Sequence, residues 1–439
     1  MPAMSAPPPV ADQSATGRGL VVAPFRGVRF DAAKVPDLAT VTSPPYDVID
    51  ADGAVALERL DPHNVVRLIL PREQSDDARG RYEHAASRLS TWQKEGFLRR
   101  DGSPAIYVYE QSAPGMLQRG LLAAVELRSP DERVVLPHED VMAGPVADRL
   151  ELMRATGANL EPILLVYEGG GPAAEVIEEV ATTEPLIDSV MDDGLRQRLW
   201  AVTDPARQVV LAADLAGRQA LIADGHHRYA TYRRLQAEHD GPGPWDRGLA
   251  LLVDSLTYPL DVQAIHRSVA DLPLREATEL AAPVFAVTGL PGADLAAGLR
   301  ALEESPARHP FLLTDGASFA LLGDPDEAAV AAALPPLHSA TWRSLDASVL
   351  HALLLERLWG ITDGSARVSY LHSAAGAMRA ASRSGGTAVL LRPVTVEQVL
   401  EVASTGERMP RKSTSFGPKP RTGLVLRLLD DEDGPDVPA

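Results

Sequence analysis

The chain has 439 residues, which is too long for one core of ordinary size, so we expect two or more domains. Its 42 Lys and Arg residues against 60 Asp and Glu residues give a formal charge of −18, which argues against a general nucleic-acid binder. The lack of Cys excludes disulfides, thiolate metal sites and cysteine nucleophiles. We find no signal-peptide core and no apolar run of membrane-spanning length, and therefore expect a cytoplasmic protein without a membrane partner.

Turn residues divide the chain into two blocks between polar ends. We expect a disordered N-terminus over 1–19, a first domain over 20–272, a second α/β domain over 273–429 and a disordered acidic tail over 430–439. Strand-like apolar runs of the first block lie at 63–71, 104–111, 119–127, 159–168, 219–225 and 247–255, with helix-like stretches at 78–98 and 172–182.

The second block alternates strand-like and helix-like stretches. Asp315-Gly316 lies between two apolar runs and predicts a hairpin. Helix-like stretches at 345–360, 373–385 and 395–404 follow, separated by strand-like ones at 367–372 and 386–393. This alternation predicts an α/β fold, mixed (α+β) over the whole chain.

The stretch QALIADGHHRYATYRRL joins an apolar strand to a helix through Asp224-Gly225. A helix N-terminus has unpaired N–H groups and a partial positive charge, and a preceding glycine lets a phosphate approach closely. Arg228 adds fixed positive charge there, and His226 and His227 add titratable positive charge. The turn is therefore predicted to bind phosphate. The alternative is a core histidine beside a surface arginine.

The stretch SPPYDVID, residues 43–50, predicts a rigid loop because two prolines fix the backbone ahead of Asp47. Asp47 is the first candidate for a general base toward a hydroxyl group, or for a ligand of Mg²⁺. Alternatively, it only caps the helix that follows.

His138 and Glu139 precede another predicted helix. A carboxylate beside an imidazole suits proton transfer from a hydroxyl group, so both are candidate catalytic residues. Arg149 on this helix, and Asn159 after its predicted end, are candidate nucleotide-binding residues. The alternative is that Glu139 only complements the positive helix N-terminus.

Residues 408–423, RMPRKSTSFGPKPRTG, concentrate basic and hydroxyl side chains in an acidic chain. Lys412, Ser413, Thr414 and Lys419 are candidate phosphate contacts. The Lys-Ser-Thr order invites comparison with a Walker A loop, but an arginine stands where the required glycine would precede the lysine. The alternative is a solvated basic loop.

A protein-bound metal site is not expected. The chain has no zinc-binding spacing of His or Cys, and the adjacent His226 and His227 splay by about 100° on a helix. Mg²⁺ would instead enter with a nucleotide.

Five motifs resemble those of a bacterial family of unknown function in the ParB/sulfiredoxin superfamily. They are ADGHHRYATY, VTSPPYDVI, LPHEDVMAGPVADRLELMRATGANLEPI, AIHR and MPRKSTSFGPKPRTGLV. The resemblance extends from VAPFRGVRF to TGLVLRLL and implies a ParB/sulfiredoxin-like nucleotide-binding domain whose Gly225 turn holds phosphates. His226 stands where sulfiredoxins have Cys, so sulfinic-acid reduction is not implied. The superfamily includes free-serine kinases, which phosphorylate the hydroxyl of L-serine.

We therefore expect a nucleotide-dependent phosphotransferase that resembles free-serine kinases and acts on a small hydroxyl-bearing metabolite. Its cofactors would be ATP or ADP with nucleotide-borne Mg²⁺, and its partners the nucleotide and the substrate. Two alternatives stay open. One is a ParB-like nucleotide-binding switch or scaffold with little turnover, and the other is a phosphodiesterase or phosphatase that uses His226 or His227 as an acid. A homodimer is compatible with the sequence.

Overall fold

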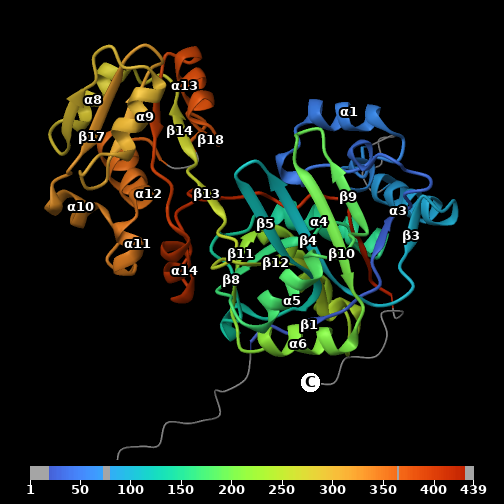
Figure 1. Cartoon of the computed structure of the whole chain (residues 1–439). Coiled ribbons are helices and arrows are strands. Elements are labelled where there is room, and N and C mark those ends of the chain that lie inside the picture. Colours follow the sequence, from blue (N-terminus) through green and yellow to red (C-terminus); the bar gives the residue numbers. More distant parts are fainter. Residues whose placement is uncertain (1–18, 73–79, 363–364, 431–439) are drawn as a thin grey trace, which may run out of the picture.

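The computed structural model describes residues 19–72, 80–362 and 365–430, which form two lobes (Figure 1). The larger lobe is built on a nine-stranded mixed sheet with the order β6-β11-β8-β12-β5-β4-β10-β9, and β1 pairs with β5. Its strands are β1 (Val22–Ala23), β4 (Ile106–Ala113), β5 (Met116–Glu126), β6 (Val135–Leu136), β8 (Ile163–Tyr167), β9 (Ile187–Val190), β10 (Arg196–Val202), β11 (Ala220–Asp224) and β12 (Arg247–Asp254).

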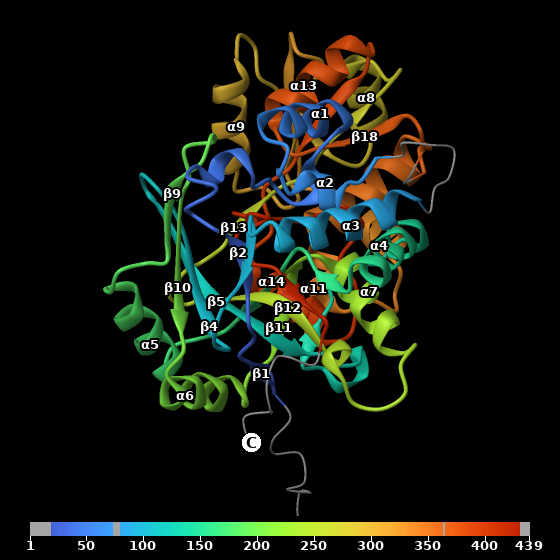
Figure 2. The same ribbon diagram turned by 90° about the vertical axis from the view of Figure 1, so that its right-hand side faces the viewer.

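Both faces of the large sheet carry buried side chains, because alternate residues of its central strands enter different cores. On β5, Leu121 and Ala123 face one core and Leu122 and Ala124 the other. The first core is closed by the helices α4 (Ala143–Thr156), α5 (Pro172–Ala181), α6 (Pro205–Leu215) and α7 (His226–Gln236). Figure 2 shows α5 and α6 toward one end of the sheet, with α4 and α7 toward the other.

A smaller layer packs against α4 at the upper right of the large lobe in Figure 1. It contains β2 (Val28–Phe30), β3 (Leu98–Arg100), α1 (Ala51–Leu60), α2 (Val66–Ile69), α3 (Gly80–Lys94) and the 3₁₀ turns η2 (Leu38–Thr40) and η3 (Tyr46–Val48). Two further 3₁₀ turns, η4 (Pro130–Glu132) and η5 (Pro244–Asp246), lie in loops of the large lobe. Helix α1 begins after Asp50, whose carboxylate accepts the Gly53 N–H.

The smaller lobe contains a six-stranded antiparallel sheet with the order β15-β17-β16-β19-β14-β18. Its strands are β14 (His266–Val269), β15 (Ala286–Gly289), β16 (Phe311–Thr314), β17 (Phe319–Gly323), β18 (Val368–Leu371) and β19 (Thr387–Leu390). Its helices are α8 (Leu274–Ala281), α9 (Leu295–Glu303), α10 (Glu327–Ala333), α11 (Ala340–Ser344), α12 (Asp346–Val349), the π-helical segment η6 (Leu350–Leu358) and α13 (Ala374–Arg383). Separate cores cover its two faces.

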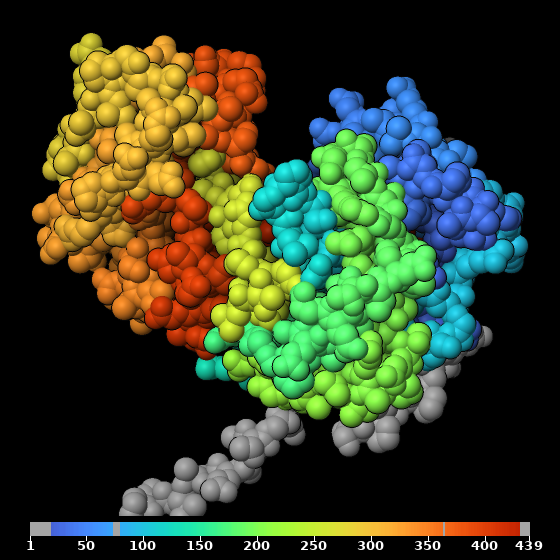
Figure 3. Space-filling view, in the orientation of Figure 1, coloured from blue at the N-terminus to red at the C-terminus, as the bar shows by residue number. Residues whose placement is uncertain are grey.

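After the small lobe the chain returns to the large sheet. Helix α14 (Val396–Ser404) and the residues that follow it close the second core, where Met409, Phe416 and Val425 are buried. We call residues 405–430 the return segment. Its strands β20 (Ser415–Gly417) and β21 (Arg427–Leu428) pair with β13 (Asp261–Gln263) and β7 (Ala158–Asn159). In Figure 3 the lobes meet along the yellow chain before β14 and red parts of the C-terminal chain.

The structure confirms the expected mixed α/β architecture and the hairpin at Asp315-Gly316, where Thr314 pairs with Phe319. The helix expected over 345–360 is divided into α12 and the wider η6, and the loop expected over 408–423 contains the short strand β20.

The expected domain boundary near residue 272 stays a prediction. The expected disordered ends lie almost wholly outside the described residues, and no described helix combines the length and the apolar character of a membrane span.

Candidate functional site

Two parallel strands bring two of the predicted motifs to one edge of the large sheet. β6 and β11 pair in parallel, with Val135 opposite Ala220. Because parallel strands end at the same edge, Glu139 after β6 lies near Asp224 at the end of β11. Side chains from both motifs therefore face one space.

Gly225 forms the turn between β11 and α7. Its φ of +92° lies in the left-handed region, and a Cβ here would lie 2.9 Å from Ile163 Cγ2 and 3.1 Å from Arg228 Nε. Only glycine meets both demands. Helix α7 starts at His226, and its first N–H groups have no acceptor within the helix, as the sequence predicted.

A cavity of about 280 Å³ opens at this edge of the sheet. It gathers residues from six separate stretches of sequence and from both lobes. Ten of the predicted site residues line it: Asp47, Glu139, Asp224, Gly225, His226, His227, Arg228, Lys412, Thr414 and Lys419. Ten of the fourteen residues nominated from the sequence thus meet at one cavity.

Four predicted site residues do not line this cavity: His138, Arg149, Asn159 and Ser413. The buried Arg149 guanidinium donates to the carbonyl of Ile69. The Asn159 side-chain oxygen accepts the Leu249 N–H at 3.1 Å, so this amide connects two parts of the fold. The Ser413 hydroxyl is buried and has no hydrogen-bond partner among the described residues.

A chain of ion pairs forms one wall of the cavity. Lys419 Nζ lies 2.9 Å from Asp47 Oδ2 and 2.6 Å from Asp224 Oδ1. The second oxygen of Asp224 accepts from Arg228, which also donates to the carbonyl of Pro162. Arg228 is only 3% exposed, so it is a buried ion-pair partner and not a surface charge.

The same contacts set the protonation of this wall. Burial alone would raise the pKa of Asp47, but the attraction of Lys419 and Arg228 outweighs it and holds that pKa below its ordinary value. Burial alone would lower the pKa of Lys419, but Asp224 and Asp47 outweigh it and raise that pKa. Asp47 is therefore an anion and a weak base in this state.

Glu139 has the opposite environment. Burial raises the pKa of its carboxyl group, and the nearby Lys412 only partly opposes this shift. Its Oε1 lies 3.4 Å from the Thr414 hydroxyl, and its side chain stays partly open to the cavity. Of the two carboxylates that were candidate bases, Glu139 is thus the stronger base.

The two histidines at the start of α7 bind backbone groups. His226 Nε2 accepts the His138 N–H at 3.2 Å, and His227 Nε2 accepts the Met142 N–H at 3.0 Å. Burial lowers the pKa of His226 well below its ordinary value and also lowers that of His227. Both rings are neutral near pH 7, so the expected titratable positive charge is absent. A neutral ring that accepts at Nε2 carries its proton on Nδ1, and in His226 this atom lies 4.0 Å from Glu139 Oε2.

His138 lies behind the cavity wall. Its Nε2 lies 3.0 Å from the Thr414 hydroxyl, and burial lowers the pKa of its ring to about 3. A neutral ring in this place holds Thr414, which in turn contacts Glu139. His138 is therefore placed to position Thr414 and has no surface on the cavity.

Tyr46 and His372 line the cavity but were not nominated from the sequence. The Tyr46 ring lies 4.4 Å from the Arg149 guanidinium and 5.9 Å from that of Arg228. Tyr46 lies between two prolines and Asp47 in the sequence, and this position in a rigid loop could have identified it as a site residue. His372 follows β18 of the small lobe, and no local pattern connects it with residues of the large lobe.

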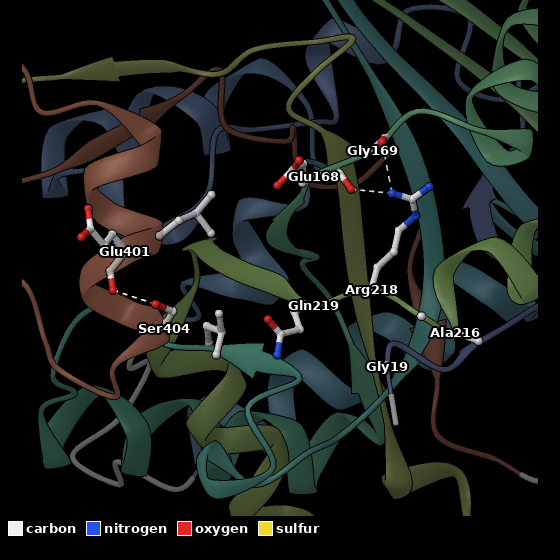
Figure 4. Close-up of a pocket in the computed structure, with 11 residues that line it drawn as sticks. Gly19, Glu168, Gly169, Ala216, Arg218, Gln219, Glu401 and Ser404 are labelled. Atoms are coloured by element: carbon white, nitrogen blue, oxygen red, sulfur yellow. Dashed lines mark hydrogen bonds between the residues drawn. The ribbon is translucent and has the colours of Figure 1, made fainter. Parts of the chain in front are cut away.

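A larger hollow, of about 680 Å³, lies at the opposite end of β11 (Figure 4). Its arginine, Arg218, donates to the carbonyls of Glu168, Gly169 and Gly170 and pairs with Asp214. None of the predicted site residues lines it. Because ten predicted site residues line the smaller cavity and none lines this hollow, we place the candidate site at the smaller cavity.

Metal ligands do not cluster in the part of the chain that the structure describes. No group there contains three or more His, Cys, Asp or Glu side chains arranged to hold an ion.

Fold and site together define a mixed α/β protein with a charged cavity at a strand–glycine–helix turn. The chain belongs to the family described as "Protein of unknown function (DUF1015)", whose sequence model matches residues 22–348. Lys412, Thr414 and Lys419 lie beyond these matched residues.

Several solved structures are similar to this chain. A mutant of free serine kinase in complex with ADP has a TM-score of 0.34 and 16% identity, covering 66% of this chain and 89% of that one. The same kind of mutant in complex with AMP has a TM-score of 0.36 and 14% identity, covering 73% and 92%. SbnI from Staphylococcus aureus, truncated at its C-terminus, has a TM-score of 0.36 and 13% identity, covering 70% and 90%. No curated protein matches the chain.

Proposed function

We propose that this protein is a nucleotide-dependent phosphotransferase that acts on a small hydroxyl-bearing metabolite. One observation carries the proposal: a single cavity combines the N-terminus of α7, the cations Lys412 and Lys419, and two carboxylates in opposite environments. Phosphoryl transfer needs charge neutralisation and positioning more than covalent help, and these groups supply both. The nucleotide would be ATP or ADP.

The phosphates would lie at the first N–H groups of α7 and beside Lys412. Lys412 is exposed and forms no ion pair with the described residues, whereas Arg228 and Lys419 are already paired with carboxylates. Mg²⁺ would come with the nucleotide and neutralise phosphate charge. Asp47 fits as an oxygen ligand for it, since its carboxylate is ionised and faces the cavity.

Glu139 would act as the general base. It would take the proton of the acceptor hydroxyl while the hydroxyl oxygen bonds to the terminal phosphorus. The bond from this phosphorus to the bridging oxygen breaks, and the nucleotide leaves with one phosphate fewer. Thr414, held by His138, would orient the carboxylate. Glu139 thereby takes the role for which Asp47 was the first candidate.

The neutral imidazoles weigh against a phosphatase or phosphodiesterase that uses His226 or His227 as an acid, because each would need a proton that burial disfavours. A nucleotide-binding switch would use the same phosphate contacts without turnover. We further propose that the large lobe is of the ParB/sulfiredoxin type and that the protein acts in the cytoplasm. The first proposal is based on the sequence motifs described above, and the second on the composition of the chain.

The test is a product assay. Purified protein is incubated with ATP or ADP, Mg²⁺ and a panel of hydroxy-amino acids, and phosphorylated product is measured by mass spectrometry. A phosphorylated acceptor that forms only when nucleotide and acceptor are both present supports the kinase. Nucleotide binding without product indicates the switch, and phosphate release from phospho-compounds indicates the hydrolase.

A further inference from the structure

An apolar shelf lies at the mouth of the charged cavity. Val48 and Met142 line the cavity and are 52% and 50% exposed, so they lie at its open side, and Pro145 is part of the same lining. Exposed apolar side chains are common when they are scattered, but Val48, Met142 and the half-buried Pro145 all line the one cavity that would hold the ligand. The shelf is defined here as Val48, Met142 and Pro145.

Neighbouring polar contacts hold the shelf residues in place. Val48 ends η3, in which the preceding residue Asp47 is bound to Lys419 at 2.9 Å. The backbone N–H of Met142 donates to His227 Nε2 at 3.0 Å. The chain at Val48 and Met142 is therefore held close to the phosphate-binding end of the cavity. Their exposure is a property of the folded site.

A site with cations inside and an apolar shelf at its mouth fits a ligand that is anionic at one end and flat and apolar at the other. A nucleotide has this form, since its base presents two apolar faces beyond the ribose. We propose that the shelf is the nucleobase subsite, in which Val48 and Met142 pack against the base. This inference rests on the proposed function and names the part of the cavity that distinguishes a nucleotide from inorganic phosphate.

The test compares two probes on the full chain. ADP contains both parts of the proposed ligand, whereas inorganic pyrophosphate contains only the anionic part. Val48→Ser and Met142→Gln remove apolar surface and leave the cations and the Met142 backbone N–H in place. Val190→Ser is the matched control, because Val190 is 60% exposed on β9 and does not line the cavity. Binding is measured by calorimetric titration, and circular dichroism checks the fold.

We expect each shelf variant to lose about tenfold in affinity for ADP and to keep its affinity for pyrophosphate, since the loss of a few buried apolar groups costs about this much. The control variant should match the parent with both probes. Unchanged ADP affinity in both shelf variants, or an equal loss for ADP and pyrophosphate, would overturn the subsite. If pyrophosphate binds too weakly to measure, the ADP affinities alone test the subsite: both shelf variants should bind ADP more weakly than the control variant does. A parent protein that binds neither probe contradicts the proposed function itself.

Discussion

At the scale of single residues, the cavity gives different environments to two carboxylates that look alike in the sequence. Asp47 is held as an anion by Lys419, whereas burial raises the pKa of Glu139. The sequence ranked Asp47 first because two prolines stiffen its loop. The ranking changes because basicity depends on which charges lie nearby, and Lys419 is distant in sequence.

We expect Glu139→Gln to lower turnover by about 10²–10⁴-fold while nucleotide binding changes little, because a general base acts mainly in the transition state. Steady-state kinetics with a calorimetric binding measurement separates the two effects. Asp140→Asn is the control, since the Asp140 side chain is 92% exposed beside the cavity. Equal turnover in Glu139→Gln and the parent would remove Glu139 from the mechanism.

Gly225→Ala tests the turn itself. The variant places a side chain at a φ of +92° and 2.9 Å from Ile163, so we expect a loss of about 1–3 kcal/mol in the free energy of unfolding and weaker ADP binding. Gly241→Ala has a similar φ of +83° but open space around its Cβ. Chemical denaturation should show a smaller loss for this control. Equal losses would mean that backbone strain alone explains the effect.

At the scale of elements, the return segment completes the site. Its strand β20 pairs with β13, and the N–H of Met409 donates to the carbonyl of His138 at 2.8 Å. These contacts bring Lys412 and Thr414 to the N-terminus of α7. The sequence predicted a basic loop with phosphate contacts, and the structure supplies the strand pairing that places this loop at the turn.

Lys412→Ala should weaken ADP binding by about tenfold at low salt and by less at high salt, because ions screen the attraction between an exposed lysine and phosphate. Calorimetric titrations across a salt series measure this dependence. Arg411→Ala is the control, since Arg411 is an exposed neighbour of equal charge that does not line the cavity. The assignment of Lys412 is wrong if both variants show the same salt dependence.

At the scale of the whole molecule, contacts of the return segment connect the two lobes. Glu407 accepts the Ser339 N–H at 2.9 Å, where α11 of the small lobe begins, and lies 2.9 Å from His338 Nδ1. The lobes in turn share the cavity, because Ile265 and His372 lie in its wall with residues of the large sheet. The site therefore depends on how the lobes are held together.

Glu407 predicts an acid-dependent loss of stability. Burial alone would raise its pKa, but hydrogen bonds from Ser339, His338 and Thr405 outweigh burial and lower the pKa to about 2. A depressed pKa in the folded state stabilises the fold above the unfolded value of about 4.3, and this contribution is lost as the pH falls toward 2. The parent should therefore be more stable than Glu407→Gln at pH 6, and the difference should shrink by pH 3.

Denaturant unfolding of both proteins over this pH range measures the effect. Glu303→Gln, on an exposed position of α9, is the control and should show a smaller difference from the parent. A difference between parent and Glu407→Gln that stays constant from pH 6 to pH 3 would contradict the prediction.

The sequence alone determined the local features of this protein. The apolar run before Asp224 specified a buried strand, and Gly225 specified the turn. Both features depend only on the apolar character and the backbone freedom of a few neighbouring residues. Ten of the fourteen predicted site residues line one cavity. They could be nominated from the sequence because each lies in a short motif of charged, polar or glycine residues.

Only the tertiary structure decided which charges those residues carry and which distant segments join them. Arg228 is buried against Asp224, the two histidines are neutral, and His372 enters from the other lobe. Burial and ion pairing depend on contacts between segments hundreds of residues apart, such as the one between Asp47 and Lys419. Such contacts form when β6 and β11 align and the return segment packs on the large sheet, and no local pattern encodes them.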